Sequence, residues 1–411
     1  MQTTDIAVVG AGIVGAATAH AVRMIAPSLS VTVLDKEPAA ARHQSGRNSG
    51  VIHSGLYYRP GSLKAETCRA GRRRLIEYCR ANELPFEICG KVVVATDEAE
   101  RSRLPTLLAR GVANGTGCRE LNRGELREIE PHVAGVAALS VPDTGIVDYR
   151  LVTKRLLEDV RSGGLLIFNA AVRGIEVSGN RVRLETAAGP VEASVVVNCA
   201  GLYCDRLYRL AGGRRDVQIV PFRGEYYEVT GRSRSLCRNL IYPVPDPAFP
   251  FLGVHLTRMI DGTLECGPNA VLALSREGYR PRDVSLRDAF ETFAFRGFRR
   301  LAGRHTRMGL AEMRRSLSRE AFAHAVRRLV PELRTGDLEP AAAGVRAQAV
   351  AGNGSLVDDF LIEDTERCVH VLNAPSPAAT ASLEIGRQVA ERALRVYRAN
   401  HSRPLGVPHE A

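Results

Sequence analysis

Residues 5–15 read Asp-Ile-Ala-Val-Val-Gly-Ala-Gly-Ile-Val-Gly, an apolar run that passes directly into three spaced glycines. The run over 6–9 is short and continuous, which is typical of a buried parallel strand. Small residues over 16–21 predict a helix next, and a second apolar strand over 31–34 ends at Asp35. Strand, glycine turn, helix, strand and acid therefore occur in the order of a dinucleotide-binding βαβ unit.

Each glycine of this turn has its own task. Gly10 permits the tight turn, Gly12 leaves room for phosphates beside the backbone, and Gly15 lets the helix pack closely on the strand. The helix N-terminus offers N–H groups and a positive dipole end to a diphosphate. Asp35 is placed to accept hydrogen bonds from ribose hydroxyls. The motif alone leaves both FAD and NAD open as the dinucleotide.

The segment after Asp35 favours a flavin. Lys36 leads into a loop of small and polar residues over 41–50, and Val-Ile-His-Ser-Gly-Leu-Tyr-Tyr follows at 51–58. A Rossmann domain that binds only NAD has no use for such a loop. Its backbone donors are suited to run along the diphosphate, the ribityl chain and the ring of a flavin.

The string over 43–58, continued by Pro-Gly-Ser-Leu-Lys-Ala at 60–65, closely resembles the FAD-dependent L-2-hydroxyglutarate oxidases and dehydrogenases. These enzymes belong to the D-amino-acid-oxidase and glycine-oxidase superfamily. The resemblance extends over about residues 5–395. It implies an FAD enzyme that oxidises L-2-hydroxyglutarate to 2-oxoglutarate by hydride transfer from C2 to flavin N5. One departure is Asp35, where relatives usually carry Glu; the shorter acid is expected to keep the ribose contact.

The expected fold class is α/β, with a Rossmann-like FAD-binding domain on a parallel sheet and an α+β substrate domain on an antiparallel sheet. A chain of 411 residues is too long for one ordinary core. The expected FAD-binding domain is discontinuous, over 1–80, 145–215 and 335–411, and the substrate domain takes 81–144 and 216–334. Strands are expected within the second domain over 86–95, 226–229, 240–242, 252–256 and 263–266, with an Asp261-Gly262 hairpin turn. Residues 285–330 are expected to be mostly helical and strongly basic.

The motif and the resemblance together give the expected FAD contacts. A buried strand that stops at Ala200-Gly201 and a small-residue loop that opens the last helix at 377–380 resemble cofactor-binding turns of this superfamily. The expected contacts are Gly10, Gly12, Ile13, Val14, Gly15, Asp35, Lys36, Gln44, Ser45, Arg47, Asn48, Ser49, Gly50, Val51, Val172, Ala200, Gly201, Pro377, Ala378, Ala379 and Thr380.

Oxidation of a 2-hydroxy acid also needs a carboxylate clamp and a base. Arginine binds a carboxylate through two parallel hydrogen bonds, and Arg346 lies where the relatives place such a residue. Histidine is the natural base near neutral pH, and His53 and His255 are both candidates; His53 is also a candidate to hold the flavin. The residues expected to contact the distal carboxylate are Tyr57, Tyr58, Lys64 and Arg258.

Composition narrows the remaining alternatives. The nine cysteines form no CxxC pair and no zinc-like spacing, so we expect free thiols and no metal site. No signal peptide or membrane-spanning run is visible, which predicts a protein of the cytoplasm or its membrane face. The formal net charge is +11, yet the chain has no Trp and 5% aromatic residues, which disfavours nucleic-acid binding.

Three hypotheses remain. The first is oxidation of L-2-hydroxyglutarate, a small dicarboxylate, with electrons passed to oxygen or a membrane quinone. The second is a related flavin oxidase or dehydrogenase of another hydroxy acid or of an amino acid. The third is a basic flavoprotein or nucleic-acid binder without oxidase activity. The arginine-rich region over 285–330 is either a solvated face or a site of peripheral attachment to an anionic membrane.

Overall fold

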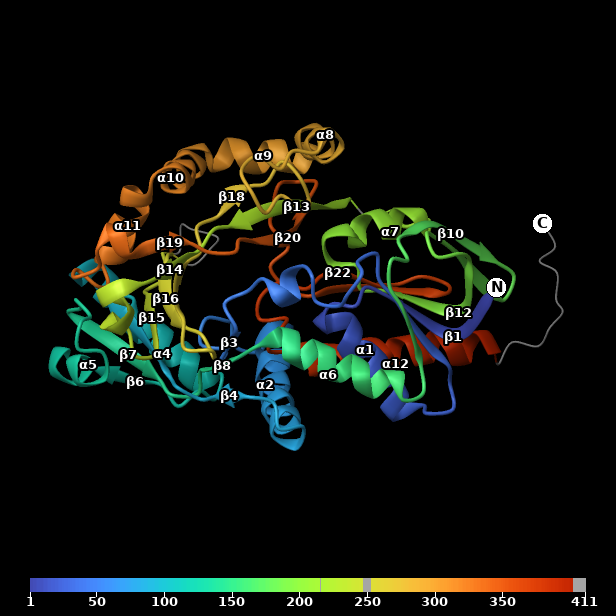
Figure 1. The fold of residues 1–411 in the computed structure, drawn as a ribbon, viewed down its shortest axis with the longest axis horizontal. Coiled ribbons are helices and arrows are strands. Elements are labelled where there is room, and N and C mark those ends of the chain that lie inside the picture. Colours follow the sequence, from blue (N-terminus) through green and yellow to red (C-terminus); the bar gives the residue numbers. More distant parts are fainter. Residues whose placement is uncertain (215, 247–252, 402–411) are drawn as a thin grey trace.

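A computed structural model describes residues 1–214, 216–246 and 253–401. The chain forms two large sheets with a cavity between them and helices on their outer faces (Figure 1). Leu252, the first residue of one predicted strand, and the domain ends at 215 and 402–411 lie outside the described residues. Parallel and antiparallel sheets occur as predicted, which confirms the fold class.

The first sheet is built on the predicted βαβ unit. Its parallel strands are β1 (Gln2–Val9), β2 (Val31–Leu34), β9 (Leu165–Ile167), β12 (Val191–Asn198) and β22 (Cys368–Asn373). Antiparallel strands extend the sheet, namely β10 (Val172–Ser178), β11 (Arg181–Thr186) and β21 (Leu361–Asp364). Val9 is opposite Leu34 on one side and Asn198 on the other, so β1, β2 and β12 end at the same edge of the sheet.

Helices pack on this sheet through a core of small and branched residues. They are α1 (Ile13–Ile25), α2 (Leu63–Ala81), α6 (Tyr149–Arg161) and α12 (Ser382–His401). Gly386 brings α12 against α1, because a Cβ at Gly386 would lie 2.5 Å from the backbone of Ala17. Among the described residues, none of the helices has the length and apolar character that crossing a membrane requires.

The second sheet has the order β19-β14-β17-β16-β15-β5-β7-β6 and is antiparallel except between β15 and β5. Its strands are β5 (Lys91–Ala95), β6 (Arg119–Leu121), β7 (Ala137–Val141), β14 (Tyr227–Val229), β15 (Leu240–Pro243), β16 (His255–Arg258), β17 (Leu264–Gly267) and β19 (Leu338–Pro340). The predicted turn joins β16 to β17, and Gly262 in it has a φ of +83°. Although β19 lies in the segment expected to belong to the first domain, it pairs with β14.

The predicted basic region over 285–330 consists of four helices, α8 (Leu286–Ala294), α9 (Arg296–Arg304), α10 (Thr306–Leu317) and α11 (Arg319–Arg327). In Figure 1 they run along one side of the molecule: α11 packs against the second sheet, while α9 and α10 lie over β20 and β18. Smaller helices are α3 (Glu98–Arg101), α4 (Leu104–Ala113), α5 (Arg123–Ile129) and α7 (Cys204–Leu210).

Two small sheets connect the two large ones. The first contains β13 (Val217–Gly224), β18 (Val271–Leu272) and β20 (Gly344–Ala351), and the second contains β3 (Val51–Ile52), β4 (Phe86–Glu87) and β8 (Gly145–Val147). In the first of them Phe222 is opposite Arg346. These connections bring the loop after β3 and the arginine of β20 to the cavity between the large sheets.

Candidate active site

A cavity of about 1550 Å³ lies at the carboxyl end of the parallel sheet. Small-molecule sites usually enclose roughly 300–1,000 Å³, so this cavity has room for a large cofactor together with a substrate. The carboxyl edge of an open α/β sheet is where such folds bind ligands. Both large sheets contribute to its lining, with Gly10 and Asp35 from one and His255 from the other.

The glycine turn after β1 has the geometry of a phosphate cradle. Gly10 has a φ of +112°, and a Cβ there would lie 2.4 Å from the carbonyl oxygen of Cys199. A Cβ at Gly15 would lie 1.9 Å from the carbonyl oxygen of Gly10, so Gly15 sets the close approach of α1 to β1. In the described part of the chain, the N–H groups of Gly12 and Val14 have no hydrogen-bond acceptor. These donors at a helix N-terminus fit a diphosphate.

Asp35 is held rigidly at the end of β2. One carboxylate oxygen accepts a hydrogen bond from the Ala11 N–H at 2.6 Å, and the other accepts one from the Glu37 N–H at 2.8 Å. Burial raises the pKa of Asp35, while these two bonds oppose the rise. The carboxylate lines the cavity beside the glycine turn, where a dinucleotide's ribose is expected. This donor and acceptor set fits FAD.

The loop over 44–50 is ordered by its own side chains. The Asn48 side-chain amide donates to the carbonyl oxygens of Gln44 and Ser45, both at 2.9 Å. The Gln44 side-chain oxygen accepts from the Ala347 N–H at 3.2 Å, which ties the loop to β20. The Ser45 hydroxyl oxygen accepts from the Ile13 N–H at 2.8 Å. The loop is therefore preformed along one side of the cavity.

Most of the expected FAD contacts line the cavity, and three do not: Gly15, Gly50 and Thr380. Thr380 is fully buried and supports the site indirectly. Its hydroxyl oxygen accepts from the His53 N–H at 3.0 Å and is 2.9 Å from the Tyr149 hydroxyl. Gly50 has a φ of +65°, and its carbonyl oxygen accepts from the Val147 N–H. These residues shape the backbone behind the cavity wall.

His255 lies in the cavity lining with a defined tautomer. Its Nδ1 is 2.9 Å from the carbonyl oxygen of Gly253, which can only accept, so Nδ1 carries the hydrogen and Nε2 keeps its lone pair. The ring stacks on Tyr242 with centroids 3.9 Å apart. Burial lowers the pKa of His255 to about 3, and Arg346 and Lys91 contribute to the lowering. His255 is therefore neutral at physiological pH and able to accept a proton at Nε2.

His53 also lines the cavity and is also neutral. Burial lowers its pKa to about 3, with Lys91, His255 and Lys64 adding to the effect. Its Nε2 is 3.3 Å from the Ser376 hydroxyl, a group that can donate or accept. This contact therefore does not fix the tautomer of His53, whereas the bond to Gly253 fixes the tautomer of His255.

Arg346 reaches the same part of the cavity from β20. Its guanidinium hydrogen-bonds the phenol oxygen of Tyr226, and its charge acts on His255. A cation beside a neutral imidazole is a suitable place for the carboxylate of a 2-hydroxy acid, because the hydroxyl then lies close to the imidazole.

The four residues expected at a distal carboxylate divide into two groups. Tyr57, Tyr58 and Lys64 line the cavity, whereas Arg258 does not. The Arg258 guanidinium forms an ion pair with Glu87 and donates to the carbonyl oxygen of Arg238 at 2.8 Å. Lys64 lies 3.1 Å from the Asp358 carboxylate and 5.3 Å from the centroid of the Tyr58 ring. Arg258 stabilises the second sheet instead of facing the cavity.

Sequence reasoning missed three residues near His255: Tyr226, Tyr242 and Lys91. Tyr226 and Tyr242 line the cavity, and Lys91 lies behind it. The tyrosines occur in predicted strand segments that carry no motif. Lys91 follows a glycine at the start of a strand, and only the pairing of β5 with β15 brings it to the site.

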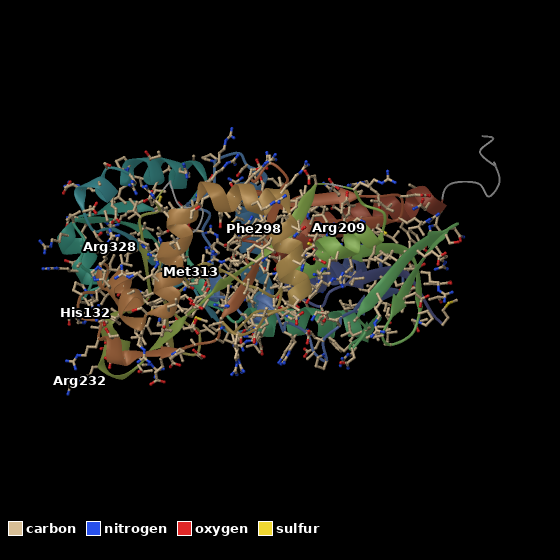
Figure 2. The ribbon with its side chains drawn as sticks, turned by 90° about the horizontal axis from the view of Figure 1, so that it is seen from above. His132, Arg209, Arg232, Phe298, Met313 and Arg328 are labelled. Carbon is tan, nitrogen blue, oxygen red and sulfur yellow. The ribbon has the colours of Figure 1, made fainter. Side chains whose placement is uncertain are left out.

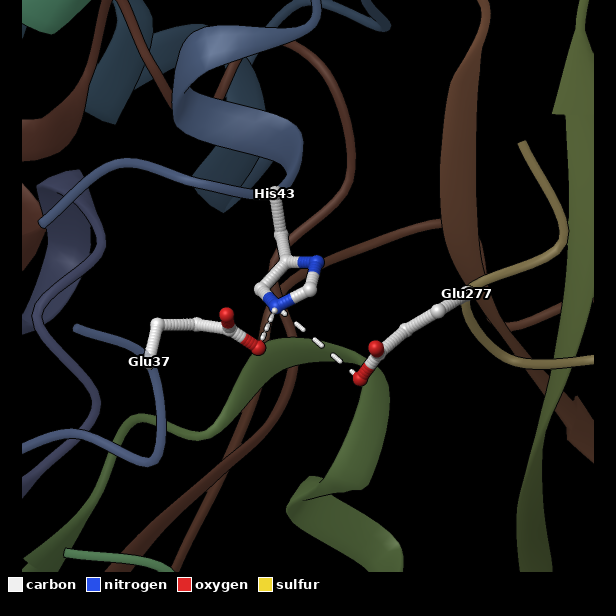
Figure 3. Close-up of side chains that lie close together, drawn as sticks. All are labelled: Glu37, His43 and Glu277. Atoms are coloured by element: carbon white, nitrogen blue, oxygen red, sulfur yellow. Dashed lines mark hydrogen bonds and ion pairs between the residues drawn. The ribbon is translucent and has the colours of Figure 1, made fainter. Parts of the chain in front are cut away.

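Side chains at the other end of the cavity form an ion-pair cluster, shown in part in Figure 3. His43 Nε2 is 3.0 Å from a carboxylate oxygen of Glu37 and 3.9 Å from one of Glu277. Three such groups have the spacing of a cation site, but the Lys36 ammonium contacts both carboxylates and supplies the positive charge. We call Lys36, Glu37, His43 and Glu277 the clasp. It ties the loop after β2 to the segment between β18 and α8.

The cavity has a dinucleotide cradle at one end and an arginine beside a neutral histidine at the other. This combination is typical of a two-domain, flavin-dependent oxidoreductase. The model of the FAD dependent oxidoreductase family (DAO) matches residues 5–392, and the chain belongs to this family. FAD is therefore its cofactor, as the resemblance implied, and the chain is an enzyme.

Two curated relatives are similar over nearly the whole chain. An L-2-hydroxyglutarate dehydrogenase of Indibacter alkaliphilus is 46% identical over 394 residues, which are 95% of this chain and 99% of the relative. The L-2-hydroxyglutarate dehydrogenase of Escherichia coli K12 is 45% identical over 97% of this chain and 95% of its own. The predicted family is thereby confirmed. Among solved structures, dithionite-reduced L-alpha-glycerophosphate oxidase from Mycoplasma pneumoniae with FAD bound has a TM-score of 0.77 at 24% identity, over 97% of this chain and 95% of that one.

Proposed function

We propose that this enzyme oxidises L-2-hydroxyglutarate to 2-oxoglutarate. The observation that carries the proposal is His255, a neutral histidine whose Nε2 has no hydrogen-bond partner among the described residues. It feels the charge of Arg346 in a cavity that fits FAD. Relatives that are 45–46% identical over nearly their whole length are L-2-hydroxyglutarate dehydrogenases. The third hypothesis, a binding protein without oxidase activity, does not account for this pairing.

Arg346 is proposed to hold the carboxylate next to C2 of the substrate. Its planar guanidinium can form two parallel hydrogen bonds with a carboxylate, which fixes the plane of that group as well as its position. The bond to Tyr226 orients the guanidinium before the substrate arrives. Since binding then costs little reorganisation, the geometry of C2 relative to His255 is defined by the enzyme.

His255 is proposed to remove the hydroxyl proton of the substrate. The O–H bond breaks toward Nε2 while the C2–H bond breaks as a hydride, and the C2–O bond becomes a carbonyl. FAD, when bound, supplies the hydride acceptor. The hydrogen bond from Nδ1 to the carbonyl oxygen of Gly253 stabilises the imidazolium that forms. Tyr57 and Tyr58 are proposed to face the second carboxylate, with Lys64, which is paired with Asp358, beside them.

An absorbance spectrum of the purified enzyme tests this proposal. Under anaerobic conditions, L-2-hydroxyglutarate should bleach the flavin band near roughly 450 nm, because reduction removes the conjugation of the oxidised ring. The D-enantiomer is the matched control and should leave the band unchanged. Faster bleaching by L-glutamate or by another hydroxy acid would instead support the second hypothesis. A flavin that none of these acids bleaches would overturn the assignment.

We also propose that the enzyme works in the cytoplasm, attached peripherally to an anionic membrane face, with electrons passed to oxygen or to a membrane quinone. Apolar side chains on α8 and α10 face solvent, with Leu286 86%, Phe290 75% and Leu317 82% exposed. We call Leu286, Phe290, Phe293, Leu310, Met313 and Leu317 the apolar face; Figure 2 looks onto these helices, with Met313 labelled. The exposed arginines of α8, α9 and α10 are Arg287, Arg296, Arg299, Arg300, Arg304, Arg307 and Arg314.

Charge and spacing support a lipid surface as the partner of this face. The apolar positions recur at i, i+4 and i+7 on α8 and at i, i+3 and i+7 on α10, so each forms one stripe. The acidic residues of these helices, Asp288, Glu291 and Glu312, are buried or half-buried in ion pairs. The exposed charge of this surface is therefore mainly that of the arginines. Apolar stripes surrounded by arginine suit the interface of an anionic bilayer.

A further inference from the structure

Lys91 is a buried cation beside the substrate end of the cavity. It opens β5, and the residue is 4% exposed. Its ammonium nitrogen is 4.5 Å from the centroid of the Tyr57 ring and 4.8 Å from that of Tyr242. The same nitrogen is 3.5 Å from the Tyr57 hydroxyl oxygen. Two aromatic faces and one phenol oxygen therefore surround a charge that has been removed from water.

Lys91 has no anionic partner in the described part of the chain. No carboxylate contributes to its electrostatic environment, and the nearby Cys68 is a neutral thiol because burial raises its pKa to about 12. Burial lowers the pKa of Lys91 itself to about 7. An unpaired charge in an apolar site costs several kcal/mol, so an anion that enters the cavity would relieve that cost.

Tyr57 connects Lys91 to the cavity. Tyr57 lines the cavity, whereas Lys91 does not. Burial raises the pKa of Tyr57 well above its usual value, so the phenol keeps its proton. Its oxygen can accept from the Lys91 ammonium while its O–H donates into the cavity. A donor polarised by a neighbouring cation forms a stronger hydrogen bond with an anion.

The cavity near Tyr57 is also lined by Arg59, Lys64, Arg103 and Arg110. Arg110 donates to the carbonyl oxygen of Tyr57 at 3.1 Å, and Arg103 donates to that of Pro245 at 3.4 Å. The Lys64 ammonium lies 3.1 Å from an Asp358 carboxylate oxygen and donates to the Asp358 carbonyl oxygen at 2.9 Å. Arg346 is assigned above to the carboxylate next to C2. Lys91 differs from these partnered cations in having no anionic or carbonyl partner among the described residues, and it reaches the cavity through the Tyr57 hydroxyl.

We infer that Lys91 is a positioning residue that acts through the Tyr57 hydroxyl to select substrates with a second carboxylate. The inference rests on the proposed function in that this carboxylate is the distal one of L-2-hydroxyglutarate. Lys91 touches neither the reacting atoms nor the flavin. Its contribution is to discriminate dicarboxylates from monocarboxylic 2-hydroxy acids, which the Arg346 clamp alone does not distinguish.

The arrangement has a consequence for pH. A bound dicarboxylate favours the charged ammonium, so its affinity should be greatest below pH 7 and fall as Lys91 loses its proton above that pH. The titratable groups around Lys91 do not change charge there. His53 and His255 have a pKa of about 3, Cys68 has one of about 12, and burial raises the pKa values of Tyr57 and Tyr242.

Ligand titrations of the FAD-loaded enzyme test this inference. Glutarate and butyrate, which share a chain with and without the second carboxylate and lack the reacting hydroxyl, are titrated while the flavin spectrum is followed. Lys91→Met should weaken glutarate binding by about tenfold or more, the usual loss for a charge-assisted hydrogen bond, and leave butyrate within about twofold. Lys91→Arg should recover part of the loss.

Tyr57→Phe provides the second variant and removes only the hydroxyl. It should also weaken glutarate binding without affecting butyrate binding. The double variant Tyr57→Phe/Lys91→Met should lose little more glutarate affinity than either single variant, because Lys91 acts through the Tyr57 hydroxyl. Above pH 7 the wild type should lose affinity for glutarate, while Lys91→Met should bind it equally at pH 6 and pH 8. If Lys91→Met does not retain FAD, Tyr57→Phe and the wild-type pH profile decide the outcome.

Equal losses for glutarate and butyrate, or additive losses in the double variant, would overturn the inference. A wild type that does not discriminate glutarate from butyrate would overturn it as well, whatever substrate bleaches the flavin. If the wild type discriminates the two acids but L-2-hydroxyglutarate does not bleach the flavin, the proposed function fails while the role of Lys91 stands for another dicarboxylate. The two failures are therefore distinguishable.

Discussion

His53 is half-buried and His255 is buried, and both are neutral residues of the cavity lining, yet they differ in one hydrogen bond. The Nδ1–H of His255 donates to a carbonyl oxygen, which directs the lone pair of Nε2 away from the backbone. The Nε2 of His53 faces a serine hydroxyl that can donate to it. This difference is the reason that we propose His255 as the base and a supporting place for His53.

We predict that His255→Gln slows flavin reduction by L-2-hydroxyglutarate by about 10²- to 10⁴-fold, the usual contribution of a general base. Glutamine keeps a polar group at this position but cannot accept the proton. The measurement is the stopped-flow rate of anaerobic bleaching at saturating substrate. FAD content should be unchanged, because His255 lies on the second sheet, far along the cavity from the glycine turn in the fold.

His53→Gln is the matched control for this variant. Both histidines line the cavity and have the same pKa of about 3, so simple loss of a neutral imidazole from the lining should affect the two variants alike. A larger rate loss in His53→Gln than in His255→Gln would contradict the assignment and identify His53 as the base. Neither histidine should give the rate an inflection near pH 6.5, because both stay neutral from pH 5 to pH 8.

At this scale the sequence predicted residues that belong to motifs better than residues that depend on packing. The glycine turn, Asp35 and most of the 44–51 loop line the cavity as expected, because short-range geometry places them. Arg258 was expected to contact the substrate, but its guanidinium forms an ion pair with Glu87, which lies 171 residues away in the sequence. Lys91 was missed because its neighbours Tyr57 and Tyr242 come from other elements.

Elements with strong local patterns were predicted well, and their pairing was not. The run over 86–95 was expected to belong to the sheet of the second domain, but only β5 does, where it pairs with β7 and β15, while β4 pairs with β8 in a small sheet. Gly90 separates them with a φ of +78°, which turns the chain out of one sheet and into another. Alternating apolar residues specify a strand, but they do not specify its neighbour.

We predict that the apolar face on α8 and α10 binds anionic vesicles. The double variant Phe290→Ser/Leu317→Ser should reduce binding to phosphatidylglycerol vesicles by about tenfold or more, since fully burying one such side chain contributes about 1.5–3 kcal/mol. Vesicle flotation measures the bound fraction. High salt should also reduce binding, because the arginines around the face are solvent-exposed.

Val112→Ser is the matched control for the membrane prediction. Val112 is 62% exposed at the end of α4, outside the apolar face, and its replacement should leave vesicle binding unchanged. Equal binding of the wild type to neutral phosphatidylcholine vesicles would contradict the role of the arginines. Failure to bind anionic vesicles at low salt would end the proposal and leave the helices as a solvated basic face.

At the scale of the whole molecule, both large sheets line one cavity. The glycine turn and Asp35 come from the first sheet and His255 from the second, while β20 carries Arg346 between them. This arrangement could not be derived from strand patterns, because the strands of the two large sheets alternate along the chain. The contact of His43 with Tyr279, for example, joins residues 236 positions apart. The resemblance to a known family supplied the two-domain architecture, and physical patterns supplied its parts.

The clasp joins the two halves of this cavity near Asp35, and we predict that it slows the release of FAD. Glu277→Gln removes the carboxylate that pairs with Lys36 from the segment after β18. Partly exposed ion pairs contribute about 0.2–1 kcal/mol each, so FAD should dissociate about two- to fivefold faster. The rise of flavin fluorescence after dilution measures this rate.

Glu332→Gln is the matched control, because it breaks a surface pair in which Glu332 and His132 lie 2.9 Å apart. This variant should release FAD at the wild-type rate. Equal rates in all three proteins would show that the clasp stabilises the fold without holding the cofactor.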